Sequence, residues 1–278
     1  MTAMIGTDPE LFLRDSRTGA VVPGVGLIGG TKKRPLPMKD MRDGFALQED
    51  NVMLEFNVPP SGTAREFSRT VSRALEYAYD FIRIKQPHLE LDRGHCARMF
   101  TMEQLDSMQA RVFGCSADYN AHEEGRALPT PSPESLIEGD MAWRFSGGHV
   151  HLGYDIDVPP FVVGALADVF LGLPSVQLDR QGARRTLYGS AGRYRPTAHG
   201  LEYRTLSNYW IWEDSTRLTI GQQAFKLLSF LEEWDQARLQ TVFAEVPWTD
   251  VISAINQEDS RKAMDLMAYL RGDLGVPL

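Results

Sequence analysis

Apolar and polar residues alternate at every second position along several segments, a pattern that predicts β-strands. Residues 51–58 show it most clearly, because Val52, Leu54 and Phe56 would share one face of an extended chain. The segments predicted to contain strands are residues 1–60, 147–153 and 200–206. Pro and Gly gather in other stretches, which we expect to form loops beside a site, namely residues 22–37, 129–133 and 189–200.

Elsewhere apolar residues recur with the period of a helix. Thr63 and Glu66 form a capping-box pattern at the start of one such segment, Pro87 ends it, and Asp214 is the expected N-cap of another. The predicted helices span residues 63–86, 159–172 and 214–233, and the tail from 235 to 271 is mostly helical. Strands interleaved with helices at irregular spacing predict an α+β fold rather than a regular βαβ winding.

Length and composition are those of an ordinary globular protein. The chain has 278 residues, of which 43% are hydrophobic and 24% charged. We expect one large domain over residues 1–230 and a C-terminal helical extension, 231–278, packed on the same domain. A long apolar segment and a signal peptide are both missing from the sequence, so the prediction is a cytoplasmic protein with no membrane contact.

Charge and cysteine content exclude further classes. The net charge of −8 disfavours bulk nucleic-acid binding, although arginines cluster between Arg180 and Arg204 and suit a small anionic ligand. Cys96 and Cys115 lack the CxxC spacing of a zinc knuckle. A disulfide between them is conceivable, but a reducing compartment favours two free thiols.

Four of the predicted strand segments carry polar side chains two residues apart. Side chains with this spacing point to the same face of a strand. The pairs are Asp8 with Glu10, Glu55 with Asn57, His149 with His151, and Glu202 with Arg204. If these strands share one sheet, four carboxylates and two histidines gather on one of its faces.

Such a cluster has a definite chemistry. Neighbouring carboxylates repel one another and raise each other's pKa, so cations must neutralise them. Oxygen ligands with an occasional imidazole suit Mg²⁺ or Mn²⁺ better than structural Zn²⁺. Divalent ions of this kind serve phosphoryl transfer, in which the downstream arginines would complete a phosphate clamp.

Each pair also has a simpler interpretation. Polar residues two apart are common on the solvent face of an amphipathic strand. Glu202 and Arg204 could be a surface ion pair, and the two histidines could be core residues bonded to backbone. The coincidence of four pairs with one ligand chemistry favours the metal site.

The order of these motifs resembles that of the glutamine synthetase and glutamate–cysteine ligase superfamily. More closely, the chain resembles the phage phiEco32-like carboxylate–amine ligases, also called amidoligase type 2. The motifs that carry the resemblance are Asp8-Pro9-Glu10, Leu54-Glu55-Phe56-Asn57, Gly147-Gly148-His149-Val150-His151-Leu152-Gly153 and Glu202-Tyr203-Arg204. Supporting stretches lie at residues 29–32, 48–57, 113–120 and 185–195, and the whole resemblance covers about residues 4–225.

The resemblance implies a fold and a set of site residues. The implied fold is α+β, with a curved, mainly antiparallel sheet of glutamine-synthetase-like type and helices on its convex side. Its concave face would bind ATP and two or three Mg²⁺ or Mn²⁺ ions. By position, the metal ligands would be Asp8, Glu10, Glu55, His149 and Glu202, with Glu49 or Asp50 as possible helpers. Arg204 would stabilise the transferring phosphoryl group. Asp-Pro-Glu departs from the family's Glu-x-Glu and shortens one ligand arm.

Further residues are candidates for substrate contacts or for proton transfer. The expected ATP or substrate contacts are Lys32, Arg185, Arg195, Asn57, His151, Asn120 and Tyr188. Glu55, Asp118 or a histidine would accept the proton of the amine. Alternatively, Lys32 and Arg185 are solvated surface residues, and Asp118 and Asn120 cap a turn.

The predicted function is therefore an ATP-dependent carboxylate–amine ligase that forms an amide through an acyl phosphate. Its substrates would be small molecules or peptides, and its location would be the host cytoplasm if it is phage-encoded. The sequence leaves both a monomer and an oligomer open. Two alternatives use the same fold: a guanidino-kinase-like phosphotransferase and a catalytically inactive phage interaction protein. A metallohydrolase is disfavoured because the sequence has no HExxH signature.

Overall fold

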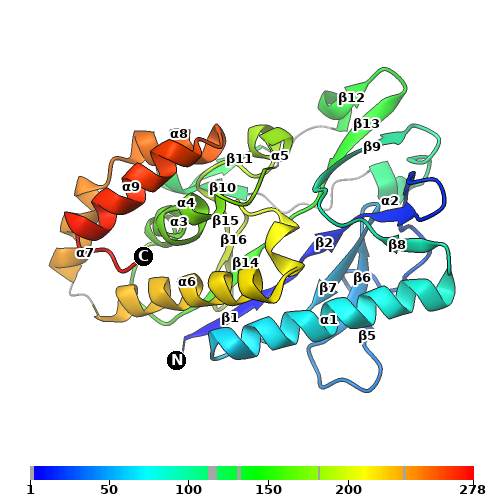
Figure 1. Ribbon diagram of the computed structural model, residues 1–278, viewed down its shortest axis with the longest axis horizontal. Helices are drawn as coiled ribbons and strands as arrows, with labels where there is room; N and C mark the ends of the chain where they lie inside the picture. The colour runs from blue at the N-terminus through cyan, green and yellow to red at the C-terminus, as the bar shows by residue number, and fades with distance from the viewer. Residues whose placement is uncertain (1–2, 112–117, 130–132, 181, 234–235) are drawn as a thin grey trace.

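A computed structural model describes residues 3–111, 118–129, 133–180, 182–233 and 236–278. Cys115 and most of the stretch 113–120 lie outside these ranges. The described part of the chain forms two larger and two smaller sheets with helices packed around them (Figure 1). It is an α+β protein whose sheets are antiparallel, and this confirms the predicted class.

The larger sheets hold the strands that carried the polar pairs. The six-stranded sheet runs in the order β1 (Met4–Thr7), β14 (Val150–Gly153), β16 (Gly200–Tyr203), β15 (Arg193–Thr197), β10 (Asp118–Asn120) and β11 (Arg126–Leu128). The four-stranded sheet runs in the order β2 (Glu10–Leu11), β7 (Met53–Asn57), β6 (Ala46–Asp50) and β5 (Leu36–Pro37).

Two three-stranded sheets complete the β-structure. One joins β12 (Ile137–Glu138), β13 (Met141–Phe145) and β9 (Ala97–Thr101). The other joins β4 (Val21–Val22), β3 (Leu13–Asp15) and β8 (Leu89–Leu91). Part of the predicted loop at residues 189–200 is in fact strand β15, whose residues pair with β16.

The N-terminal strand passes from one large sheet to the other. β1 pairs with β14, and after Asp8 and Pro9 the chain continues as β2, which pairs with β7. The N–H of Phe56 donates to the carbonyl of Pro9 at 3.3 Å, and the N–H of Glu10 donates to the carbonyl of Gly147 at 2.9 Å. The single sheet expected from the sequence is therefore wrong in detail, because the polar pairs lie on two sheets that meet at Asp8 and Pro9.

Long helices cover the sheets where apolar periodicity predicted them. Helix α1 (Ala64–Lys85) begins after Thr63, whose hydroxyl accepts the N–H of Glu66 at 3.1 Å, and it packs against α6 (Asp214–Glu233). The predicted helix 159–172 is divided into α3 (Pro160–Ala167) and a π-helical turn, η3 (Asp168–Gly172). The shorter helices are α2 (Met108–Arg111), η1 (Ala121–Glu123), η2 (Pro133–Leu136), α4 (Leu173–Ser175), α5 (Gly182–Leu187) and η4 (Asn208–Ile211).

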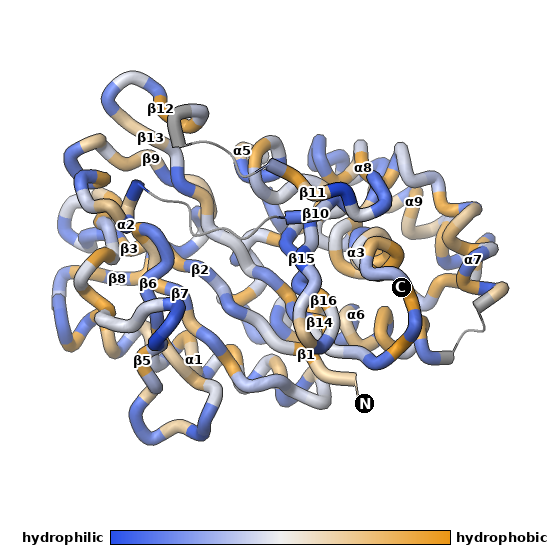
Figure 2. The backbone as a smooth tube through the Cα atoms, turned by 180° about the vertical axis from the view of Figure 1, so that it is seen from behind, coloured by the Kyte–Doolittle hydropathy of each residue, from blue (hydrophilic) through white to orange (hydrophobic). Residues whose placement is uncertain are grey.

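The C-terminal tail packs on the same hydrophobic core as the rest of the chain. It forms α7 (Gln236–Glu245), α8 (Trp248–Asn256) and α9 (Ser260–Gly272), and α4 contacts both α8 and α9. Helix α3 is apolar along most of its length and lies between the six-stranded sheet and these helices (Figure 2). None of the described helices combines the length and the apolar character that a membrane span needs.

Trp210 connects this core to the loop that precedes β14. Its fully buried ring stacks on Phe67 with centroids 5.6 Å apart, and its Nε1 donates to the carbonyl of Gly148 at 3.1 Å. We expect Trp210→Ala to lower the free energy of unfolding by about 3–5 kcal/mol, because it removes a large buried ring. Trp210→Phe should cost about 1–3 kcal/mol, since the Gly148 carbonyl loses its donor.

Urea unfolding followed by circular dichroism measures both changes. Ile84→Ala is the control, because the Ile84 side chain is 82% exposed and its loss should change stability by no more than about 0.5 kcal/mol. Equal stability of Trp210→Ala and Ile84→Ala would show that Trp210 does not hold the loop.

Candidate active site

Polar residues from six distant parts of the chain line one small cavity of about 170 Å³. The lining residues are Asp8, Glu10, Lys32, Asp50, Glu55, His149, Tyr188, Arg195, Glu202 and Arg204. The junction between β1 and β2 supplies the first two, and residues in or next to β6, β7, β14, β15 and β16 lie around them. The structure thus brings together six of the eight residues that the i, i+2 pattern singled out, and only Asn57 and His151 are not among the lining residues.

One side of the cavity holds three crowded carboxylates. Glu10 and Glu55 face each other as a cross-strand pair on β2 and β7, and Asp50 ends β6. One ligand oxygen from each lies within 4.8 Å of the others. An ion pair requires a nitrogen within 4.0 Å of a carboxylate oxygen. Among the described residues, no lysine or arginine nitrogen lies that close to any of these three carboxylates.

Burial makes this crowding costly. It raises the pKa of Glu55 well above its ordinary value of 4.5, and the charges of Asp8, Asp50 and Glu10 raise it further. Burial also raises the pKa of Glu10, although His149 opposes the change. Glu10 keeps one compensating contact, since the N–H of Gly147 donates to its Oε2 at 2.7 Å. These carboxylates therefore favour either a proton or a cation.

The other side of the cavity mixes carboxylates with imidazoles. Asp8, His151 and Glu202 form a second group whose ligand atoms lie within 4.8 Å of one another. The Nδ1 atom of His149 is 3.4 Å from Oδ1 of Asp8 and 3.3 Å from Oε1 of Glu202. Nε2 of His151 is 3.1 Å from the same Asp8 oxygen, at the more exposed rim. Although burial acts the other way, the charge of His151 holds the pKa of Asp8 well below its usual range.

Two arginines close this second side. Arg204 pairs with Glu202, and its other amino group donates to the Tyr188 hydroxyl at 2.5 Å. Arg195 lies 3.2 Å from Glu202 and 3.3 Å from Asp118. Nε of Arg204 is 3.1 Å from Asp118 as well, so Asp118 stands behind the two arginines and holds them in place. It does not line the cavity as a free proton acceptor would.

Lys32 lines the cavity beside the three carboxylates. Burial alone would lower its pKa, but the negative charges of Asp50, Glu55 and Glu10 outweigh burial and raise it. Its ammonium group is therefore fully charged and available to an anion that enters from this side.

Arg185, expected at a phosphate, is instead a buried structural residue. Its side chain is 1% exposed, and its NH2 group lies 3.2 Å from Asp179 and donates to the Ser175 hydroxyl at 2.9 Å. Glu258 from the C-terminal tail lies 3.5 Å from Nε of Arg185. Because α5 turns this guanidinium inward toward two acids, Arg185 does not line the cavity that the other predicted residues share.

Asn57, Asn120 and Glu49 also lie outside the cavity lining. Asn57 donates to the side chain of Gln48 at 3.1 Å. Asn120 caps η1, where its side chain accepts the N–H of His122 at 3.0 Å, which is the turn-capping role held open as the alternative. Glu49 accepts backbone N–H groups of residues 26, 28 and 29 and so holds that loop.

Arg184 is a supporting residue that the sequence did not reveal. Its guanidinium donates to the carbonyls of Ser146, Arg204 and Thr205 at 2.8, 2.9 and 2.6 Å. It thereby ties the segment before His149 to the segment that carries Arg204. No sequence signal distinguishes it from the neighbouring Arg185, because its partners are backbone carbonyls.

Two glycines permit the close approach of these segments. A Cβ atom at Gly147 would lie 2.2 Å from Nε2 of His149, and one at Gly148 would lie 2.4 Å from the carbonyl oxygen of Ser207. Side chains at either position would displace His149 or the chain beside it. This packing explains the Gly-Gly that precedes the histidine pair.

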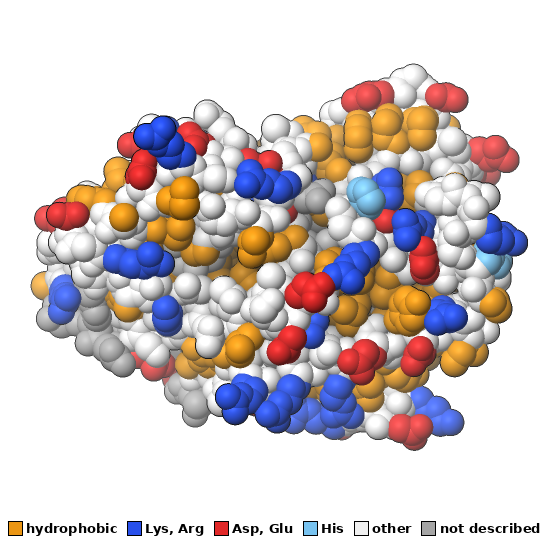
Figure 3. All heavy atoms as spheres, viewed as in Figure 1, with side chains coloured by type: hydrophobic (Ala, Val, Ile, Leu, Met, Phe, Trp, Pro, Cys, Tyr) orange, Lys and Arg blue, Asp and Glu red, His pale blue; other side chains and the backbone are white. Residues whose placement is uncertain are grey.

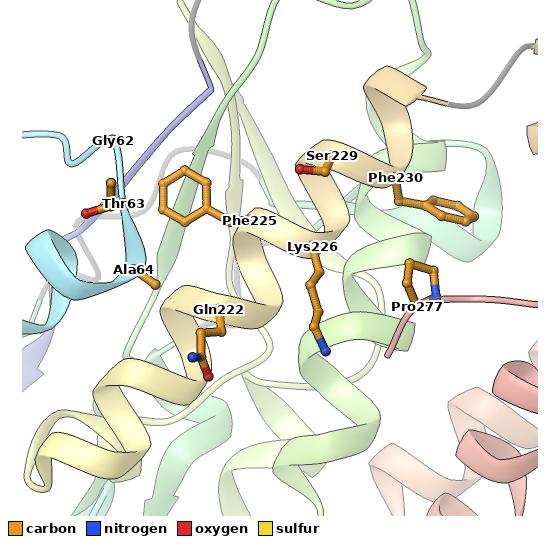
Figure 4. Close-up of a pocket in the computed structure, with 9 residues that line it drawn as sticks. All are labelled: Gly62, Thr63, Ala64, Gln222, Phe225, Lys226, Ser229, Phe230 and Pro277. Atoms are coloured by element: carbon orange, nitrogen blue, oxygen red, sulfur yellow. The ribbon is translucent and has the colours of Figure 1, made fainter.

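A larger hollow elsewhere lacks this chemistry. It has a volume of about 720 Å³ and lies between the start of α1, α6 and the C-terminus (Figure 4). Its polar lining includes Gln222 and Lys226, and none of the acidic or histidine residues discussed above borders it. The smaller cavity is therefore the candidate active site.

Comparison with known proteins bears on this site. Residues 138–244 match the family model described as phage phiEco32-like COOH.NH2 ligase-type 2. This match confirms the resemblance to the ligase family. The matched segment contains His149, Arg195, Glu202 and Arg204. The N-terminal carboxylates that line the cavity lie outside the matched residues, and the fold brings them next to these side chains. No curated protein matches the chain.

The donor atoms fit divalent cations that prefer oxygen. The first group offers three carboxylates, and the second offers two carboxylates and an imidazole. In the first group, buried carboxylates without an ion pair to the described lysines and arginines supply the electrostatic reason for such binding.

The raised pKa of Glu55 gives a pH-dependent prediction for the metal-free protein. A group whose pKa is raised by folding stabilises the fold fully below its ordinary value of 4.5, and this contribution is lost as the pH rises through the raised pKa. Glu55→Gln, which stays neutral, should therefore unfold at higher urea than the unchanged protein at about pH 8 in EDTA, and the difference should vanish near pH 4. A variant that is less stable at both pH values would contradict the repulsion.

Metal binding gives a second prediction. Saturating MgCl2 or MnCl2 should raise the Tm by about 5 °C or more, because ligand binding to the folded state alone stabilises it. Glu55→Gln and Glu202→Gln should each lose most of this increase. Glu232→Gln, an exposed carboxylate on α6, serves as the matched control and should retain it. Differential scanning fluorimetry makes the measurement, and an equal increase in all four proteins would rule out this cavity as the binding site.

Proposed function

We propose that this protein is an ATP-dependent carboxylate–amine ligase that forms an amide bond through an acyl-phosphate intermediate. The observation that supports it most directly is one cavity in which two acidic groups lie beside Arg195, Arg204 and Lys32. The family match adds weight, since its description names a ligase of COOH and NH2 groups. We also propose that the cavity lies on the concave face of a glutamine-synthetase-like sheet, as the sequence resemblance implies.

The chemistry requires an anion to attack an anion. A substrate carboxylate must approach the γ-phosphate of ATP, and the two repel each other. Lys32 on one side and Arg195 on the other would draw both groups into the cavity. Divalent ions held by the two acidic groups would neutralise phosphate charge and stabilise the transferring phosphoryl oxygens.

Arg204 is the residue best placed to hold the phosphoryl group as it moves. Its guanidinium is fixed by Glu202, by Asp118 and by the Tyr188 hydroxyl, so its direction is set before the substrate binds. Although burial opposes it, contact with Tyr188, Glu202 and Asp118 keeps the pKa of Arg204 well above its ordinary value. A fixed, charged donor of this kind stabilises developing charge without reorganisation.

The amine must lose a proton when it attacks the acyl phosphate. Asp118 is poorly placed to accept it, because it does not line the cavity and lies 3.3 Å from Arg195 and 3.1 Å from Arg204. Glu55 and His151 are better suited, since the pKa of each is raised and both lie at the acidic groups. We propose that either Glu55 or His151 accepts this proton.

The cavity accommodates the reacting groups only. Pockets that hold a whole drug-sized ligand occupy about 300–1,000 Å³, which is roughly two to six times the volume of this cavity. At about 170 Å³, the cavity suits phosphate and carboxylate groups, while the nucleoside and the remainder of the substrate would lie outside it. Small molecules or peptides that present a terminal carboxylate fit this arrangement, and a cytoplasmic location would supply the ATP.

Trapping of the intermediate tests the proposal. Purified protein is incubated with ATP, MgCl2 and a panel of amino acids and short peptides, with hydroxylamine as the amine. A ligase releases ADP and forms a hydroxamate only when a suitable carboxylate is present. Arg204→Lys should lower this rate by about 10²- to 10³-fold, because the fixed donor is lost. Arg17→Lys, which changes an exposed arginine that does not line the cavity, should not.

Other outcomes discriminate against the proposal. Phosphorylation of a guanidino compound without amide formation would identify a phosphotransferase on the same site. Undiminished hydroxamate formation in Glu202→Ala would contradict the assigned residues.

A further inference from the structure

Helix α1 exposes an unusual arrangement of charges along one face. Arg65, Arg69 and Arg73 are exposed and spaced four residues apart, so they lie together on its N-terminal half. Glu76 and Asp80, also exposed and four apart, continue the same face on the C-terminal half. Basic side chains gather along the lower edge of the molecule in Figure 3, where Figure 1 places the start of α1.

This arrangement is unfavourable for the helix on its own. Like charges four residues apart each destabilise a helix by about 0.2–0.5 kcal/mol. Arg65 also lies in the first turn, where the helix dipole disfavours a positive charge. The local charges therefore conflict with helix stability, and an oppositely charged surface would relieve the conflict.

The two halves of the face complement each other. The pairs Arg65 with Asp80 and Arg69 with Glu76 share one midpoint, between Ser72 and Arg73. If a second α1 lies antiparallel across a two-fold axis at this midpoint, both pairs are in register. Symmetry repeats each pair, so four ion pairs form between the helices.

We propose that the exposed face of α1 binds a second copy of this chain in an antiparallel, two-fold arrangement. A hollow of about 330 Å³ beside the basic half supports this occupant. Four arginines line it, namely Arg42, Arg65, Arg69 and Arg73, against the single carboxylate of Glu66. In the stated register, Asp80 of the second copy faces this excess of positive charge.

The interface is small and electrostatic. Helix α1 has 22 residues, which corresponds to a length of about 33 Å. One helix face of this length places the contact at the lower end of interface sizes, below about 1,200 Å². The association is therefore weak and sensitive to salt, which screens exposed charges.

Sedimentation velocity of the full chain at up to about 100 μM tests the proposal. The protein should form dimers in about 20 mM NaCl and dissociate in about 500 mM, as the screening length falls from roughly 20 Å to roughly 4 Å. Arg65→Glu with Arg69→Glu, and separately Glu76→Arg with Asp80→Arg, should each weaken association at least 10-fold. These substitutions are on exposed positions, and circular dichroism verifies folding.

Charge exchange then distinguishes self-association from other occupants. An equimolar mixture of the two double variants should form heterodimers, and the chain carrying all four substitutions should dimerise again. Arg17→Glu with Lys226→Glu, two exposed positions outside α1, is the matched control and should dimerise normally.

Several results would overturn the proposal. These are a monomeric protein at low salt, unchanged dimerisation in either double variant, or failure of the exchanged charges to restore it. Weakening by the arginine variant alone would show that the basic half contacts acidic residues other than Glu76 and Asp80, which contradicts the proposed register. The metal-dependent increase in Tm is independent of this surface and should persist in every variant.

Discussion

Buried negative charge at the junction of two sheets is the constraint on which the remaining structure depends. Glu10 and Glu55 are paired across neighbouring strands, and each is no more than 5% exposed. Burial leaves these carboxylates little contact with water, and Asp8 and Asp50 add further negative charge beside them. The fold holds them together because Asp8 and Pro9 join β1 to β2, so neither acidic group can move without disturbing both sheets.

The surrounding contacts keep the two sides of the cavity distinct. On one side, imidazoles and arginines balance Asp8 and Glu202, which lowers the pKa of both carboxyls despite their burial. On the other side, Lys32 faces the three carboxylates and burial raises the pKa of Glu10 and Glu55. The site is therefore asymmetric, with one side already neutralised and the other requiring a cation or a proton.

Much of this arrangement could be predicted from local sequence patterns. The period of apolar residues located α1 and α6, and the spacing of polar pairs identified most of the residues that line the cavity. Contacts between distant segments were not predictable. Asp179 and Glu258 draw Arg185 into the protein, and backbone carbonyls hold Arg184. Both arginines therefore have structural roles that the sequence around them does not reveal. Pro9 likewise gives no sign that β1 and β2 belong to different sheets.

Direct localisation of bound metal tests the central claim most closely. Crystals grown with MnCl2 and a non-hydrolysable ATP analogue would be measured at a wavelength where manganese scatters anomalously. We predict anomalous peaks at the group formed by Glu10, Asp50 and Glu55 and at the group formed by Asp8, His151 and Glu202. A well-diffracting crystal with ATP analogue bound but without manganese at either group would contradict the account.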